Sequence, residues 1–260
     1  MKHFFVAILC CLSFHLFGQI NPVDHYEARW FVLDGDTLPY RILYPENYDR
    51  TKSYPLFLFL HGAGERGADN EFQLTHGATL FLKEENRKDY PCIVVFPQCP
   101  KNETWSWLDL GDKWWTLRNW KINFPEDPEP SMKLVMALLD TLVNTEAIDV
   151  NRQYVSGLSM GGFGTFDLLA RQPKRFAAAA PICGGGNSLL PCLYKEVPIW
   201  VFHGTVDSVV PVENSRKMVA ALKNCGAEVK YTEYPDYDHN SWEGAFAEPD
   251  FLKWFFSHTR

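Results

Sequence analysis

Residues 157–161 read Gly-Leu-Ser-Met-Gly, a serine placed between two glycines. A G-x-S-x-G pentapeptide between a strand and a helix forms a nucleophile elbow, a tight turn that lifts the serine hydroxyl above the sheet. The turn leaves no room for bulky neighbours, and glycine at positions 157 and 161 gives the backbone the freedom it needs. By itself the pentapeptide is a moderate signal, because serine and glycine are common residues. Ser159 is the candidate nucleophile.

A serine hydroxyl becomes a good nucleophile only when a base removes its proton and a third group orients that base. After an elbow of this kind, the acid and then the histidine follow along the chain. An apolar run at 197–204 leads into a loop that contains Asp207. A second run at 228–234 leads into a loop that contains His239. These positions predict a triad in which Ser159 attacks, His239 moves the proton and Asp207 fixes the imidazole tautomer.

Acyl transfer also needs two hydrogen-bond donors for the negative oxygen of the transition state. The apolar run 55–60 is followed by the glycine-rich loop 61–67, which reads His-Gly-Ala-Gly-Glu-Arg-Gly. Such a loop supplies one backbone N–H, and the residue after the nucleophile supplies the other. We therefore expect the oxyanion hole to use the N–H of Met160 and that of Ala63, with Gly62 as the alternative to Ala63.

The hydrophobic pattern predicts the elements that must position these residues. Apolar and polar residues alternate on either side of an Asp-Gly-Asp turn at 34–36, which indicates an antiparallel hairpin at a sheet edge. The later apolar runs are continuous, which indicates parallel strands covered on both faces. The pattern predicts a mostly parallel, doubly wound α/β sheet of about eight strands, at 29–34, 38–44, 55–61, 92–97, 152–157, 176–182, 197–203 and 228–234. Helices are expected at 132–146, 160–171, 212–224 and 242–257.

Four motifs in this order resemble those of the α/β-hydrolase superfamily: Leu-His-Gly-Ala-Gly-Glu-Arg-Gly, Gly-Leu-Ser-Met-Gly-Gly, His-Gly-Thr-Val-Asp-Ser-Val-Val-Pro and Asp-His-Asn-Ser-Trp. Within it, the chain is similar to the secreted carbohydrate-esterase and feruloyl-esterase-like branch, also labelled dienelactone-hydrolase-like or "predicted peptidase". The resemblance covers residues 28 to 260. It implies the α/β-hydrolase fold and a serine esterase that needs no metal and no cofactor. The implied substrate is a small-molecule or polysaccharide ester, feruloyl or acetyl, with a peptidase, a polyester depolymerase or a catalytically silent binding protein as alternatives.

The segment 98–131 is predicted to be an insert after the fourth strand of the sheet. It contains five of the nine tryptophans and ends in a proline-rich stretch, and it lacks helical or strand periodicity through most of its length. Because it follows the fourth strand, we expect it to fold over the site as a cap. Large aromatic rings supply flat contact area for a sugar or an aromatic acyl group, although each ring taken alone is more often packed in a core. The candidate substrate contacts are Trp105, Trp107, Trp115 and Trp242.

Composition and the N-terminus bear on location and partners. The net charge of −7 and the lack of a basic run argue against nucleic-acid binding. A basic start at 1–3 and an apolar stretch at 4–17 are typical of a secretory signal peptide, and are short for a membrane span. We expect residues 1–19 to be cleaved and 20–260 to form a single catalytic domain, secreted or periplasmic, without stable membrane insertion. A retained anchor is the alternative.

Several further side chains have more than one interpretation. Five cysteines follow the predicted signal peptide; Cys99 could pair with Cys183, or Cys183 with Cys192, or most could remain buried thiols. Asp238 is the rival acid of the triad, but no strand end precedes it. The other side chains of the motifs have structural interpretations: His61 and His203 hold loop backbone in place, and Glu65 pairs with Arg66, which could instead lie near substrate.

Overall fold

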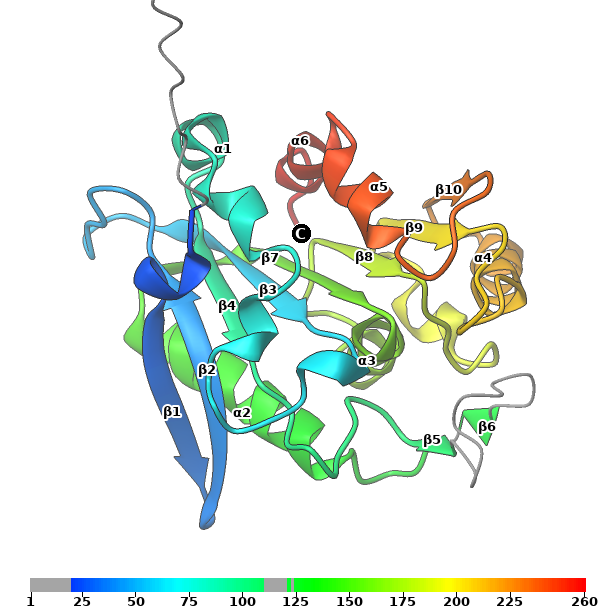
Figure 1. The fold of residues 1–260 in the computed structure, drawn as a ribbon, viewed down its shortest axis with the longest axis horizontal. Helices are drawn as coiled ribbons and strands as arrows, with labels where there is room; N and C mark the ends of the chain where they lie inside the picture. Colours follow the sequence, from blue (N-terminus) through cyan, green and yellow to red (C-terminus); the bar gives the residue numbers. More distant parts are fainter. Residues whose placement is uncertain (1–19, 110–120, 123) are drawn as a thin grey trace, which may run out of the picture.

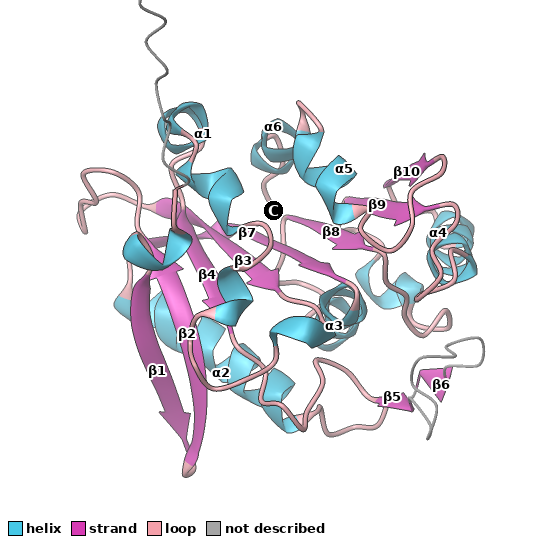
Figure 2. Cartoon of the chain, in the orientation of Figure 1, coloured by secondary structure: helices cyan, strands magenta, loops and turns pink. Residues whose placement is uncertain are grey.

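The computed structural model describes residues 20–109, 121–122 and 124–260. Eight strands form one sheet in the order β1-β2-β4-β3-β7-β8-β9-β10 (Figure 1). The strands are β1 (Glu27–Leu33), β2 (Asp36–Leu43), β3 (Tyr54–Leu60), β4 (Ile93–Pro97), β7 (Ile148–Leu158), β8 (Ala178–Ile182), β9 (Ile199–Gly204) and β10 (Val229–Tyr234). Within this sheet the β1–β2 and β2–β4 pairings are antiparallel and the other five pairings are parallel. The predicted α/β-hydrolase sheet is confirmed, including the hairpin at one edge (Figure 2).

Two hydrophobic cores lie on opposite faces of this sheet. Successive residues of a strand point to opposite faces, so Leu56 and Leu58 of β3 enter one core while Phe57 and Phe59 enter the other. The first core includes residues of α2, α3 and α4, and the second includes residues of α5 and α6. The helices are α1 (Glu84–Asp89), α2 (Pro130–Thr145), α3 (Met160–Arg171), α4 (Glu213–Asn224), α5 (Trp242–Ala247) and α6 (Phe251–Phe256). No helix in the described ranges is long and apolar enough to cross a membrane.

The prediction of one continuous helix at 242–257 is wrong, because the segment forms two helices, α5 and α6. Between them lies Glu248, whose backbone is extended at φ −61° and ψ 121°. The next residue is Pro249, which has no N–H to donate and disfavours helical backbone at the residue before it. Both short helices contribute residues to the same core, Ala245 from α5 and Phe251 from α6.

The described parts of the predicted insert contact α3. Trp105 is fully buried, and its Nε1 donates to the carbonyl oxygen of His61 at 3.0 Å. The guanidinium of Arg171 lies 4.3 Å from the ring centre of Phe124. β5 (Leu108–Asp109) and β6 (Lys121–Ile122) pair as a two-stranded ribbon, which the sequence pattern did not indicate. Residues 110–120 lie outside the described ranges, so the expected cap stays a prediction.

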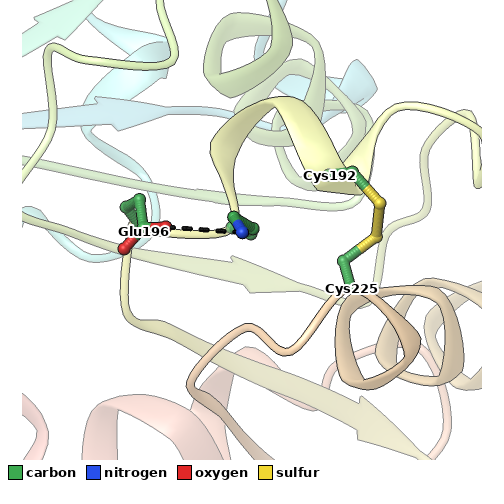
Figure 3. The surroundings of a disulfide bond; sticks show 4 residues. Cys192, Glu196 and Cys225 are labelled. Carbon is green, nitrogen blue, oxygen red and sulfur yellow. Dashed lines mark ion pairs between the residues drawn. A yellow bond between two sulfur atoms is a disulfide. The ribbon is translucent and has the colours of Figure 1, made fainter.

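A disulfide joins Cys192, in a 3-10 turn before β9, to Cys225 at the end of α4 (Figure 3). Both pairings considered from the sequence are therefore wrong: Cys99 and Cys183 are buried free thiols, as is Cys92. The two bonded residues are 33 positions apart, and their Cα atoms lie 5.2 Å from each other. Only the packing of α4 against the sheet brings them together.

Breaking this disulfide is expected to lower the free energy of unfolding by about 2–4 kcal/mol, because a covalent loop of this length restricts the unfolded chain. Urea unfolding of Cys225→Ala, compared with Cys92→Ala, measures the effect. Equal unfolding midpoints for Cys225→Ala and the parent protein would contradict it.

Candidate active site

The loop between β7 and α3 holds Ser159 in a strained conformation. Its backbone has φ 53° and ψ −117°, a combination that residues other than glycine rarely adopt. The turn is tight because α3 starts at the next residue, and a Cβ on Gly161 would collide with the carbonyl oxygen of Leu60. A Cβ on Gly162 would lie 2.5 Å from the carbonyl oxygen of Ile182. Close backbone packing therefore explains the glycines that follow the serine.

The structure brings Ser159, His239 and Asp207 into one hydrogen-bonded chain. His239 Nε2 lies 2.9 Å from Ser159 Oγ, and His239 Nδ1 lies 2.8 Å from Asp207 Oδ2. The acid and the histidine come from the loops after β9 and β10, and the serine comes from the end of β7. A carboxylate can only accept hydrogen bonds, so the Nδ1 atom carries the proton and Nε2 is left to accept from the serine hydroxyl.

The Asp207 carboxylate is fully buried and surrounded by donors. Oδ1 accepts from the N–H groups of Val209 and Val210, at 2.9 and 2.7 Å. Oδ2 lies 3.2 Å from His203 Nε2, in addition to its contact with His239. Burial alone would raise the pKa of Asp207, but the hydrogen bonds from His203 and His239 outweigh burial and hold that pKa well below its usual range. This carboxylate stays ionised at neutral pH.

Asp238, the rival acid, has a different position. Its Oδ1 accepts from the backbone N–H of Ser208 at 2.7 Å and from that of His239 at 2.8 Å. It therefore fastens the two loops to each other through backbone contacts, whereas the imidazole ring of His239 faces Asp207.

The glycine-rich loop lies directly on the serine. A Cβ on Gly62 would be 3.7 Å from Ser159 Cβ, and Ala63 begins a 3-10 turn at Ala63–Glu65. His61 fixes the loop, with Nδ1 2.6 Å from the Gly62 carbonyl oxygen and Nε2 accepting from the N–H of Cys99 at 2.9 Å. Burial lowers the pKa of His61 to about 4, so the ring is neutral at neutral pH. The Met160 N–H lies at the start of α3, where the helix dipole favours negative charge.

The four aromatic candidates have different surroundings. The prediction for Trp105 is wrong, because this fully buried ring packs against α3, where a Cβ on Gly164 would lie 3.2 Å from its Cγ. Trp107 is about a third exposed and donates to the Asp127 carbonyl oxygen at 2.8 Å. Trp115 lies outside the described residues. Trp242 is the one beside the hydrogen-bonded chain, with its ring centre 5.4 Å from that of His239 and nearly perpendicular to it.

Sequence reasoning missed two features near the site. Glu65 pairs with His76, Oε1 to Nε2 at 3.7 Å, whereas Arg66 donates to the carbonyl oxygens of Ala63 and Glu103. The expected Glu65–Arg66 pair is therefore wrong. Cys183 lies beside Asp207 and His239. Its place directly after a predicted strand was the available signal, because the carboxyl ends of parallel strands meet at one edge.

A mostly parallel eight-stranded sheet of this order, with a Ser-His-Asp chain at the carboxyl ends of its strands, defines an α/β-hydrolase. A model of the phospholipase/carboxylesterase family matches residues 48–253, and the chain belongs to this family.

Proteins of known structure or sequence are similar to this chain. A solved thermostable esterase matches 92% of this chain at a TM-score of 0.83 and 39% identity. A bifunctional acetylxylan esterase/xylanase of Neocallimastix patriciarum is 30% identical over 65% of this chain. The chain spans 64% of the first protein's length and 21% of the second's. A ferulic acid esterase from Anaeromyces mucronatus, solved with ferulic acid, shares the fold at a TM-score of 0.64 and 15% identity, over 88% of this chain and 89% of its own.

The depressed pKa of Asp207 predicts an acid-dependent loss of stability. The folded-state pKa lies below the unfolded value near 3.8, so the ionised carboxylate stabilises the fold above that pH and the contribution is lost as pH falls below it. Between about pH 5 and pH 2, the free energy of unfolding of the parent protein should fall by on the order of 2 kcal/mol more than that of Asp207→Asn. The variant has no carboxylate at this position that could become protonated. Urea unfolding across this range measures it, and the exposed Asp127→Asn serves as the control. A parallel pH dependence in Asp207→Asn and the parent protein would exclude this contribution.

Proposed function

We propose that this protein is a serine carboxylic ester hydrolase that works through an acyl-enzyme. The observation that carries the proposal is the position of His239, whose two ring nitrogens lie within hydrogen-bond distance of Ser159 Oγ and Asp207 Oδ2. This is the arrangement that a base needs in order to take a proton from a serine while an acid holds its tautomer.

In the proposed reaction, Ser159 Oγ attacks the ester carbonyl carbon while His239 Nε2 takes the hydroxyl proton. The tetrahedral oxyanion is bound by the N–H groups of Met160 and Ala63, each worth roughly 3–4 kcal/mol in the transition state. Collapse of the tetrahedral intermediate breaks the bond between the acyl carbon and the alcohol oxygen. The alcohol then leaves with the proton held by His239. A water molecule then attacks the acyl-enzyme by the same steps, and the acid product and free Ser159 are released.

The proposed substrates are carbohydrate-linked esters with feruloyl or acetyl groups. The support is the indole ring of Trp242 next to His239, together with the activities named for two relatives, an acetylxylan esterase/xylanase and a ferulic acid esterase. The predicted signal peptide at 1–19 supports export to a place where such polymers occur.

Replacing the nucleophile tests the reaction class. Ser159→Ala is expected to lower kcat by about 10⁶-fold, because it removes the hydroxyl that forms the acyl-enzyme. Hydrolysis of p-nitrophenyl acetate by the purified protein measures it, with unfolding curves to show that the variant folds. A loss below about tenfold would falsify the assignment of Ser159.

A panel of substrates tests the proposed specificity. Methyl ferulate, acetylated xylan, longer p-nitrophenyl esters, a polyhydroxyalkanoate and a prolyl-peptide amide are compared at equal enzyme concentration. Higher kcat/KM for ferulate or acetylated sugar is expected. Equal or faster turnover of the peptide or the polyester would replace the carbohydrate esterase with a peptidase or a depolymerase.

Matched variants distinguish the two aspartates. Asp207→Ala should lower kcat by about 10⁴-fold, because the imidazole loses the group that fixes its tautomer. Asp238→Ala should lower kcat far less, since the hydrogen bonds of its carboxylate to the described residues are with backbone N–H groups and a serine hydroxyl. Rates on p-nitrophenyl acetate measure both. If the larger loss belonged to Asp238→Ala, the acid would have to be reassigned.

A further inference from the structure

A buried thiol lies beside the Asp207–His239 pair. Cys183 directly follows β8, is fully buried and has φ 40°, so its position is strained like that of Ser159. Its Sγ, a carboxylate oxygen of Asp207 and a ring nitrogen of His239 all lie within 4.8 Å of one another. The proposed ester hydrolysis uses the acid and the histidine but gives the thiol no part.

A second buried polar group lies beside the thiol. Ser241 is fully buried, and its Oγ interacts with the Cys183 sulfur but makes no other hydrogen bond among the described residues. A thiol is a weak hydrogen-bonding group, so this contact satisfies the buried hydroxyl poorly.

We propose that Cys183, Asp207 and His239 form a site for a thiophilic divalent cation of the zinc type, and that occupation of this site inhibits the enzyme. Thiolate sulfur, imidazole nitrogen and carboxylate oxygen are the donors that Zn²⁺ takes in tetrahedral sites. Bonds of about 2.0–2.3 Å place such donors roughly 3.3–3.7 Å apart, which the side chains reach from their present spacing with small movements. A water molecule would take the fourth position.

The charges and protons of this site balance. The cation displaces the thiol proton, which is released, and takes His239 Nδ1, whose proton moves to Nε2. Thiolate and carboxylate then cancel the two positive charges, as burial requires. A proton on Nε2 faces Ser159 Oγ, so the ring can no longer take the serine proton. Cation binding stands on the geometry alone, whereas inhibition also rests on the proposed function.

The donor set also predicts which ions bind. Sulfur and imidazole ligands select Zn²⁺, Cd²⁺ and Cu²⁺ over Mg²⁺ and Ca²⁺, which prefer six or more oxygen ligands. A bound soft metal is therefore an inhibitor, because the hydrolytic reaction uses Asp207 and His239 without a cation.

Binding is tested without turnover, in the Ser159→Ala background of the full chain purified without a histidine tag. Calorimetric titration with Zn²⁺ and ultraviolet difference spectra with Cd²⁺, which absorbs when bound by thiolate, give affinity and ligand type. Adding Cys183→Ala should weaken the binding of the cation at its tightest site by roughly 100-fold or more. Even mutations of residues that only hydrogen-bond to metal ligands lower metal affinity by about 10–100-fold. Adding Cys92→Ala, which removes a buried thiol elsewhere, should leave it unchanged. Equal binding by both variants would overturn the proposal.

Inhibition is tested separately on p-nitrophenyl acetate with the Ser159 protein, each variant being compared with its own rate in the presence of chelator. Zn²⁺ should inhibit the parent protein and Cys92→Ala to the same degree, and Mg²⁺ should inhibit neither protein. Cys183→Ala should keep its activity in the presence of Zn²⁺. If Cys183→Ala does not fold, a variant that carries both Cys92→Ala and Cys99→Ala replaces it, because Cys183 is then the free thiol that remains among the described residues. The Cd²⁺–thiolate absorption band should persist in this double variant. Loss of the band would overturn the proposed site. Binding without inhibition would contradict only the coupling to the active site, and no hydrolysis by the parent protein would instead refute the proposed function.

Discussion

The fully buried carboxylate of Asp207 is the constraint on which the site depends. A buried charge is tolerated only when it is paired and hydrogen-bonded, and this one has donors from two loop N–H groups and two imidazoles. His203 is itself held by Ser215 of α4, whose Oγ lies 2.7 Å from Nδ1. The charge therefore ties the loop after β9 to α4 and to the loop after β10.

The position of the imidazole follows from that network. His239 is carried by an exposed loop, and the backbone contact of Asp238 fastens this loop to the one after β9. Trp242, the first residue of α5, packs against the imidazole ring in a T-shaped contact. Cys183, which follows β8 and donates its N–H to the Phe202 carbonyl oxygen, lies close to the same ring and carboxylate, and this proximity assembles the donors of the proposed metal site.

Burial also decides what the aromatic residues do. Trp105 fills the space over Gly164 and bonds to the backbone of His61, so it supports the loop that lies on the serine. A large ring with a polar edge is stabilised both by apolar burial and by that hydrogen bond. Trp242, by contrast, lies next to the imidazole, and this contact rather than the tryptophan-rich composition of the insert supports a role in substrate binding.

The sequence by itself determined the strands, the order of the motifs and the class of fold, because apolar runs, glycine-flanked turns and strand-end loops are local signals. Pro249 is also a local signal, because proline disfavours helical backbone at the residue before it and so separates α5 from α6. The tertiary structure alone decided that Cys192 bonds to Cys225, that Trp105 is packing and that Cys183 lies beside Asp207. These contacts join residues distant in the chain, and their distances depend on how whole helices and loops pack, which no local pattern records.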